Sequence, residues 1–178
     1  MKKLKKIAIV AIIVFVAVFS AQAQAPYKHS IGVTAGTFEA VSYKSFITNH
    51  FAFQADLGYQ YIVTDVQYWG KSFELQALNL HPNFMYEGTL TKGLYGFVGG
   101  GVSIGYLWIN PRLISGAHPK HASLGKFGTN AIVGLEYKFN IPLTLQFDFR
   151  PGYGLIFDEY KTLNFFDWNL CAGVRYTF

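Results

Sequence analysis

The sequence predicts an all-β fold: an eight-stranded antiparallel up-and-down transmembrane β-barrel, preceded by a cleaved signal peptide. Three observations support this prediction. The 178 residues are 51% hydrophobic and 18% aromatic but only 14% charged, a composition that excludes a disordered chain and suits an apolar outer surface. Beyond the N-terminal segment, apolar and polar residues alternate with a period of two. No later stretch reaches the roughly 18 to 20 continuous apolar residues of a transmembrane helix.

The N-terminal segment is typical of a secretory signal peptide. Four lysines precede an unbroken apolar run, Ile7–Phe19, which is too short to cross a bilayer comfortably. Ala21 and Ala23 supply the small residues that signal peptidase requires. We expect residues 1–23 to be removed, with cleavage after residue 25 as the alternative, and residues 24–178 to form the barrel. Loss of the four lysines lowers the formal net charge from +5 to +1, which removes the main support for a nucleic-acid partner.

Eight segments after the signal peptide carry the alternation of a strand with two different faces. In each segment large apolar and aromatic residues fall on one face, and glycine or polar residues fall on the other. The predicted strands cover, in order, residues 30–37, 40–47, 51–61, 72–86, 93–109, 130–139, 143–155 and 166–178.

Individual strands add detail to this pattern. The first two are short and are joined by a very short connection around Thr37–Glu39. The fourth slips in phase around Ala77–Leu80, and we interpret the slip as a β-bulge. The fifth contains the run Gly99–Gly101, whose small residues suit a crowded barrel interior better than a phosphate-binding loop. The last strand alternates aromatic and aliphatic residues with polar ones up to Phe178.

The connections between the predicted strands alternate in length. Short turns on one side of the barrel are expected at Thr48–His50, Glu87–Lys92 and Asn140–Pro142. Longer loops on the other side are expected at Thr64–Lys71, Asn110–Leu124 and Asp158–Asn164. An even number of antiparallel strands with short turns at one end and longer loops at the other is the pattern of an outer-membrane barrel.

A soluble lipocalin-like barrel would show the same alternation but would place the apolar face inside. Two features favour the membrane barrel. Aromatic residues cluster near the strand ends, as in the girdles of membrane barrels. The opposite face carries ionisable residues, which a soluble core would bury at a heavy desolvation cost.

We predict that these ionisable residues line the lumen and form a neutral ion-pair network, four cations against four carboxylates, which plugs and stiffens the barrel. Two alternatives stay open: the residues are satisfied by water, or they select a solute. The predicted network consists of Lys44, Asp56, Glu74, Glu136, Lys138, Asp148, Arg150 and Arg175.

Two segments of the last third resemble a known family. The ending Ala172–Phe178 is an alternating strand closed by a C-terminal phenylalanine. Gly134–Phe139, a short turn with Pro142, and then Leu143–Gly152 resemble the final hairpin of small bacterial outer-membrane β-barrel proteins, often labelled porin family or outer membrane protein beta-barrel domain. The resemblance implies a location in the bacterial outer membrane and implies that Tyr176 and Phe178 act as the signal for the barrel-assembly machinery.

The sequence offers little support for catalysis or for a bound group. His118 and His121 lie three residues apart in the longest loop, but a metal site needs a third ligand and none is adjacent. Ser123 lacks the glycines of a nucleophile elbow. The single cysteine, Cys171, permits no intramolecular disulfide and is expected to be buried. We predict no catalytic residue, cofactor or metal, although a lipid-modifying activity is left open.

Three functions remain open at this stage. The first is a structural or surface-interaction barrel, expected as a monomer, that meets outer-membrane lipids and lipopolysaccharide through its loops. Basic residues there would contact lipid phosphates: Lys71, Arg112, Lys120, Lys126 and Lys161. The alternative is a narrow porin-like channel for small or apolar solutes, and the third candidate is a soluble lipocalin-like carrier.

Overall fold

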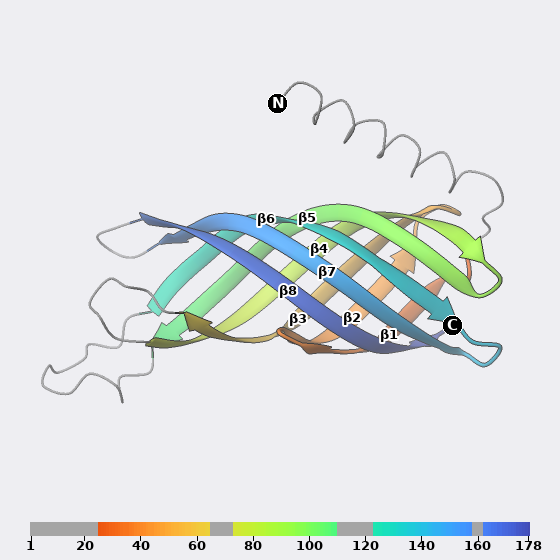
Figure 1. The fold of residues 1–178 in the computed structure, drawn as a ribbon, viewed down its shortest axis with the longest axis horizontal. Helices are drawn as coiled ribbons and strands as arrows, with labels where there is room; N and C mark the ends of the chain where they lie inside the picture. The colour runs from red at the N-terminus through yellow and green to blue at the C-terminus, as the bar shows by residue number, and fades with distance from the viewer. Residues whose placement is uncertain (1–24, 65–72, 110–122, 158–161) are drawn as a thin grey trace, which may run out of the picture.

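The computed structural model describes residues 25–64, 73–109, 123–157 and 162–178. Eight strands close into one antiparallel barrel in which each strand pairs with its neighbours in the sequence and β8 pairs with β1 (Figure 1). The strands are β1 (His29–Gly36), β2 (Glu39–Phe46), β3 (Phe51–Thr64), β4 (Phe73–Thr91), β5 (Leu94–Ile109), β6 (Ser123–Lys138), β7 (Leu143–Phe157) and β8 (Thr162–Thr177). Among the described residues, none belongs to a helix that is long and apolar enough to cross a bilayer.

The strands follow the period-two pattern of the sequence. In β7, every second residue from Thr144 to Arg150 is buried and the residues between them are exposed. The register of each strand is strongly specified because a slip of one residue would exchange its two faces. The predicted all-β barrel of eight up-and-down strands is confirmed.

Two ends of the barrel can be distinguished. One end, here called the turn end, carries the β2–β3, β4–β5 and β6–β7 turns together with the C-terminus (Figure 1). The other end, here called the loop end, is where the chain passes between β3 and β4, between β5 and β6, and between β7 and β8. The predicted loop Thr64–Lys71 lies almost entirely outside the described residues, as do most of Asn110–Leu124 and the first half of Asp158–Asn164.

The fourth strand corrects two predictions. Burial alternates without a break from Ala77 to Met85, so no bulge lies at Ala77–Leu80. The alternation of apolar and polar residues only appears to slip there, because Ala77 is apolar and yet faces the lumen. The register shifts instead between Thr89 and Thr91, and the strand continues through most of the predicted turn Glu87–Lys92. The turn is only Lys92 and Gly93, and Gly93 has a φ of 80°, which favours glycine.

Two other strands begin earlier than predicted. β6 starts at Ser123 rather than near residue 130, and β8 starts at Thr162 rather than at 166. Glycine and polar residues in 123–130 weaken the strand pattern there, although neighbouring strands pair with this segment along its length. As a consequence Lys126, expected in a loop that meets lipid phosphates, is a strand residue that is buried in the lumen.

The first hairpin is much shorter than the rest of the barrel. β1 and β2 have 8 residues each, whereas β3 to β8 have 14 to 19. The short connection predicted around Thr37–Glu39 is confirmed, since β1 ends at Gly36 and β2 begins at Glu39. The hairpin therefore covers only the turn-end part of the wall between β3 and β8.

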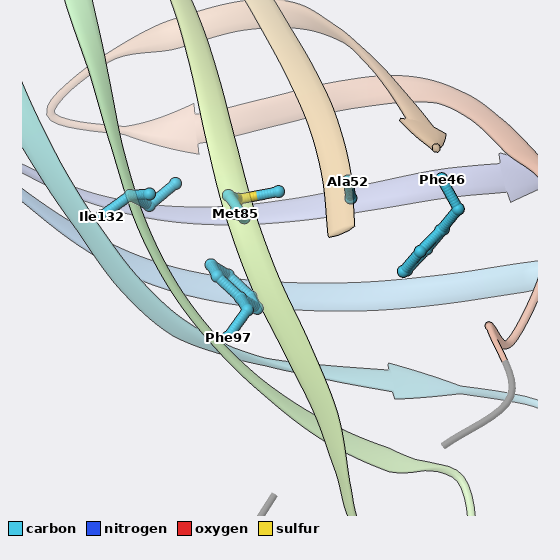
Figure 2. Close-up of a cluster of buried hydrophobic side chains, with 5 residues drawn as sticks. All are labelled: Phe46, Ala52, Met85, Phe97 and Ile132. Atoms are coloured by element: carbon cyan, nitrogen blue, oxygen red, sulfur yellow. The ribbon is translucent and has the colours of Figure 1, made fainter. Parts of the chain in front are cut away.

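Apolar side chains fill the lumen near the turn end. Five of them, from β2 to β6, form a buried cluster that Figure 2 shows: Phe46, Ala52, Met85, Phe97 and Ile132. Ala25 and Tyr27, which precede β1, pack against this cluster. The turn end of the barrel is therefore filled by side chains and covered by the segment that leads into the first strand.

Candidate functional site: the barrel lumen

The outer surface of the barrel is apolar, and its aromatic residues concentrate at both ends. Near the loop end the exposed aromatic side chains are Tyr59, Tyr106, Trp108, Phe127, Tyr153, Phe157, Phe166 and Trp168. Near the turn end they are Tyr43, Phe51, Tyr137, Phe139, Tyr176 and Phe178. Aliphatic side chains such as Val33, Leu57, Leu80 and Leu145 are exposed between them. Phe84, Phe147 and Phe149 are also exposed there. Two aromatic girdles that flank an apolar belt form the surface expected of a membrane barrel.

Four charged side chains meet in one group beside the apolar cluster, here called the lower network because it lies nearer the turn end than the two groups described next. Lys44 pairs with Glu87 and, at 2.9 Å between its Nζ and Oε2, with Glu136. Arg175 Nη1 lies 3.4 Å from Glu136 Oε2, and its Nε and Nη2 donate to the hydroxyl of Ser42 at 3.1 and 2.9 Å. All four charged groups are at most 1% exposed. Buried charges in such a site are stable only when they are paired and hydrogen-bonded.

The middle of the lumen holds a second group, here called the central network. Arg150 Nη1 lies 2.6 Å from Asp56 Oδ2, and its Nε and Nη2 donate to the two carboxylate oxygens of Asp148 at 2.5 and 3.2 Å. Gln54 donates to Asp56 at 2.9 Å. Gln146 donates to Asp148 at 2.7 Å and accepts a bond from Arg175, so that it joins the central network to the lower one.

A third group lies nearer the loop end and is here called the upper network. Lys126 Nζ lies 2.7 Å from Asp167 Oδ2. Gln60 donates to Asp167 Oδ1 at 3.0 Å and to Asn169 Oδ1 at 2.9 Å. Asn79 donates to Gln60 Oε1 at 2.8 Å. Asp167 is 13% exposed, so this group is less completely buried than the other two.

The structure brings six of the eight predicted lumen residues together: Lys44, Glu136 and Arg175 in the lower network, and Asp56, Asp148 and Arg150 in the central one. Lys138 is not among them. Its ammonium group donates to the backbone carbonyls of Phe139 and Ile141 at the β6–β7 turn. The side chain of Glu74 lies outside the described residues.

Three charged lumen residues were missed by sequence reasoning. Glu87 was assigned to a turn and Lys126 to a loop, and Asp167 was seen on the polar face of the last strand without a partner. Among the described residues the ion pairs therefore join four cations to five carboxylates rather than four to four: Lys44, Lys126, Arg150 and Arg175 with Asp56, Glu87, Glu136, Asp148 and Asp167. Glu87 could have been found from the sequence, because in a fourth strand that continues past residue 86 every second residue faces the lumen and position 87 is one of them.

Tyr27 closes the lower network from the turn end. Its hydroxyl donates to Glu136 Oε1 at 2.7 Å, and its ring packs edge-on against Phe46 with 5.2 Å between the centroids. Lys44 Nζ lies 5.8 Å from the Tyr27 centroid and 5.3 Å from that of Phe97. The ammonium group is thus held between carboxylates and aromatic rings, with no open space left around it.

The glycine run and the cysteine that the sequence singled out have structural roles in the barrel wall. A side chain at Gly99 would fall on the backbone of Phe84, so the glycine run reflects close packing of β4 and β5. Cys171 is 1% exposed, and its Sγ lies 3.6 Å from the carbonyl oxygen of Phe38. His118 and His121 lie outside the described residues, as does the side chain of Ser123. In the described ranges no three His, Cys, Asp or Glu residues are arranged to hold a metal ion.

The predicted assembly signal lies at the turn end. The side chains of Tyr176 and Phe178 are exposed on the outer surface, with exposed fractions of 56% and 61%. The backbone of Phe178 exchanges two hydrogen bonds of 2.9 Å with His29, which closes the barrel between β8 and β1. Recognition of these residues by an assembly machinery stays a prediction.

Comparisons with known proteins give matches in structure only. No family model matches the sequence, and no curated protein matches it significantly. The chain is similar to the crystal structure of Neisserial surface protein A, with a TM-score of 0.59 and 16% identity over 84% of this chain and 93% of that one. It is also similar to a major outer membrane protein from Thermus thermophilus, with a TM-score of 0.55 and 14% identity over 85% of this chain and 98% of that one. A third similar structure is the N-terminal β-barrel domain of Pseudomonas aeruginosa OprF, with a TM-score of 0.51 and 19% identity over 88% of this chain and 100% of that one. The chain therefore has the fold of small, eight-stranded outer-membrane β-barrel proteins.

Proposed function

We propose that this chain is an integral protein of the bacterial outer membrane, with a structural or surface-interaction role and a lumen that is closed to water-filled passage. It is exported by residues 1–23 and is inserted as a monomer. Its partners are the lipids of that membrane, including lipopolysaccharide, and, during insertion, a barrel-assembly machinery that reads Tyr176 and Phe178. We propose no catalytic role.

The observation that carries the closed lumen is the burial of its charges. The six charged side chains that the sequence placed there and the structure brings together are each 0% exposed: Lys44, Asp56, Glu136, Asp148, Arg150 and Arg175. An eight-stranded barrel has an interior that side chains are just able to fill, unlike the open channels of barrels with sixteen or more strands. Linked ion pairs across this interior connect β2, β3, β4, β6, β7 and β8, which favours a stiff barrel over a pore.

The apolar outer surface supports the membrane location. Exposed apolar side chains cover every strand, and a soluble monomer rarely exposes contiguous apolar patches larger than a few hundred Å². A bilayer removes this surface from water and leaves the paired charges inside. A soluble lipocalin-like carrier would need the opposite arrangement.

The proposal is tested by recording from the purified full-length protein in planar bilayers. Folding is checked first by electrophoresis of boiled and unboiled samples from the outer-membrane fraction, since a closed barrel stays folded in detergent until it is heated. We expect a mobility shift on boiling and no large, stable conductance steps. Large steps would overturn the closed lumen in favour of the narrow channel, and recovery from the soluble periplasm without a shift would favour the lipocalin-like carrier.

A further inference from the structure

The short β1–β2 hairpin leaves a gap in the barrel wall at the loop end. On one side, Tyr59 is the last β3 residue paired with β2, opposite Glu39, although β3 continues to Thr64. On the other side, Cys171 is the first β8 residue paired with β1, opposite Gly36, although β8 begins at Thr162. The segments 60–64 and 162–169 thus border the gap with no strand of the described chain between them.

Side chains rather than a backbone ladder bridge this gap. Gln60, on the β3 edge, donates to Asp167 and Asn169, on the β8 edge, at 3.0 and 2.9 Å. Thr37, at the tip of the hairpin, donates through its hydroxyl to Asn169 at 3.3 Å. In the described chain these side-chain hydrogen bonds, and no strand pairing, hold the two edges together.

The gap lies at the edge of the apolar belt. Tyr59 and Trp168 are exposed on its two sides and belong to the loop-end aromatic girdle, which marks the membrane–water interface. An unpaired strand edge is not tolerated in the hydrocarbon region, because its backbone groups would lack partners. Long loops face the cell exterior in barrels of this kind, so the gap opens at the interfacial level of the outer leaflet.

Beyond the polar side chains of the upper network, apolar side chains line the lumen at the level of the gap. Ala77 and Leu107 face inward near the loop end and are fully buried, while Leu124, Ile156 and Phe165 face inward and are half-buried. These side chains come from β4 to β8 and lie at or beyond the upper network. Lys126 Nζ lies 4.7 Å from the Phe165 ring centroid, at the boundary between the polar and the apolar part. Such walls fit hydrocarbon rather than a hydrated solute.

An apolar groove on the outer face leads to the gap. Its volume is about 460 Å³, and it lies over the short hairpin and the adjoining parts of β3 and β4. Its outward-facing lining includes Val33, Ala35, Val41, Leu57, Tyr59 and Leu78. Ala35 adjoins the hairpin tip and Tyr59 adjoins the β3 edge, so the groove reaches the gap from the membrane side.

We propose that the gap above the β1–β2 hairpin is a lateral port that admits one hydrocarbon chain of an outer-leaflet amphiphile into the loop end of the lumen. The hydrocarbon chain leaves the groove, passes between Gln60 and Asn169, and lies against Leu107 and Phe165. The upper network borders it on the side of the turn end. This inference goes beyond the closed lumen proposed above and is compatible with it, because the central and lower networks block passage below the port.

The test uses palmitic acid that carries a diazirine on its alkyl chain, added to phosphatidylcholine vesicles that contain the full-length protein. After irradiation, mass spectrometry locates the modified residues. We expect adducts on outward residues such as Leu80 and, in addition, on the inward residues Ala77 and Leu107. The inward residues Met85 and Phe97, on the turn-end side of the central network, are expected to stay unmodified. Adducts confined to outward residues would overturn the port, and so would equal labelling of Met85 and Leu107.

A variant that fills the port sharpens the test. Gln60→Trp is expected to reduce labelling of Ala77 and Leu107 several-fold while labelling of Leu80 is unchanged. Phe147→Trp, on the outer face of β7, is the matched control and should leave both patterns as in the wild type. Boiled and unboiled samples verify that each variant is folded, and if Gln60→Trp fails to fold, the wild-type pattern decides the question by itself. Undiminished inward labelling in folded Gln60→Trp would show that the chain enters by another route.

Discussion

The two ends of this barrel differ in how the wall is paired and in how completely the charges of the lumen are buried. At the turn end and in the middle, each strand is paired with both of its neighbours, the charges of the lower and central networks are buried, and ion pairs link strands on opposite sides of the lumen. At the loop end the wall is interrupted, Asp167 is partly exposed, and a few side-chain hydrogen bonds replace a strand ladder. We infer from this contrast that the turn end and the middle provide stability, while the loop end is free to carry a function.

The largest effect should come from breaking the central network. Arg150→Met leaves Asp56 and Asp148 buried without their partner, and loss of one member of a buried pair typically costs about 3 to 5 kcal/mol. We expect a lower urea midpoint for unfolding from lipid vesicles. The triple variant that adds Asp56→Asn and Asp148→Asn removes the stranded charges and should recover most of the loss. A loss under about 1 kcal/mol for Arg150→Met would mean that solvent reaches these charges.

A smaller effect is expected from adding a side chain where two strands pack closely. A Cβ at Gly99 would fall on the backbone of Phe84, whereas a Cβ at Gly125, near the loop end, meets nothing within 4 Å. Gly99→Ala should therefore destabilise the barrel by about 1 to 3 kcal/mol, while the matched Gly125→Ala should be neutral or stabilise it by up to about 1 kcal/mol. Both are measured by the same unfolding assay. Equal values for the two variants would show that crowding of the wall at Gly99 does not govern its stability.

The smallest effect is expected in the upper network. Lys126→Met breaks one ion pair with the partly exposed Asp167, which keeps its hydrogen bond from Gln60. The loss should be about 1 to 2 kcal/mol, between the range for exposed pairs and that for fully buried ones, and below that of Arg150→Met. Unfolding of both variants in the same vesicles at two salt concentrations checks the order, because the less buried pair is more strongly screened. A loss as large as that of Arg150→Met would show that the upper network stabilises the barrel as much as the central network does.

The errors of the sequence-based prediction have a common cause. Alternation located eight strands and the inward parity of Lys44, Asp56 and Arg150, because a period of two is written directly into the sequence. Strand ends were less accurate where the pattern weakens: Glu87 lies past the predicted end of the fourth strand, and Lys126 precedes the predicted start of the sixth. In both places pairing with a neighbouring strand extends a segment whose own residues resemble a turn or a loop.

By itself, the sequence determined which residues face the lumen and which face outward, and therefore the barrel fold, because each face needs its own kind of residue along the whole strand. The partners of each charge depend on stagger around the closed barrel, which no single strand encodes. Only the tertiary structure could decide that Lys138 bonds to its own turn while Lys44 reaches Glu87 and Glu136. The same holds for the gap above the first hairpin, which exists only because eight-residue strands are closed against longer neighbours.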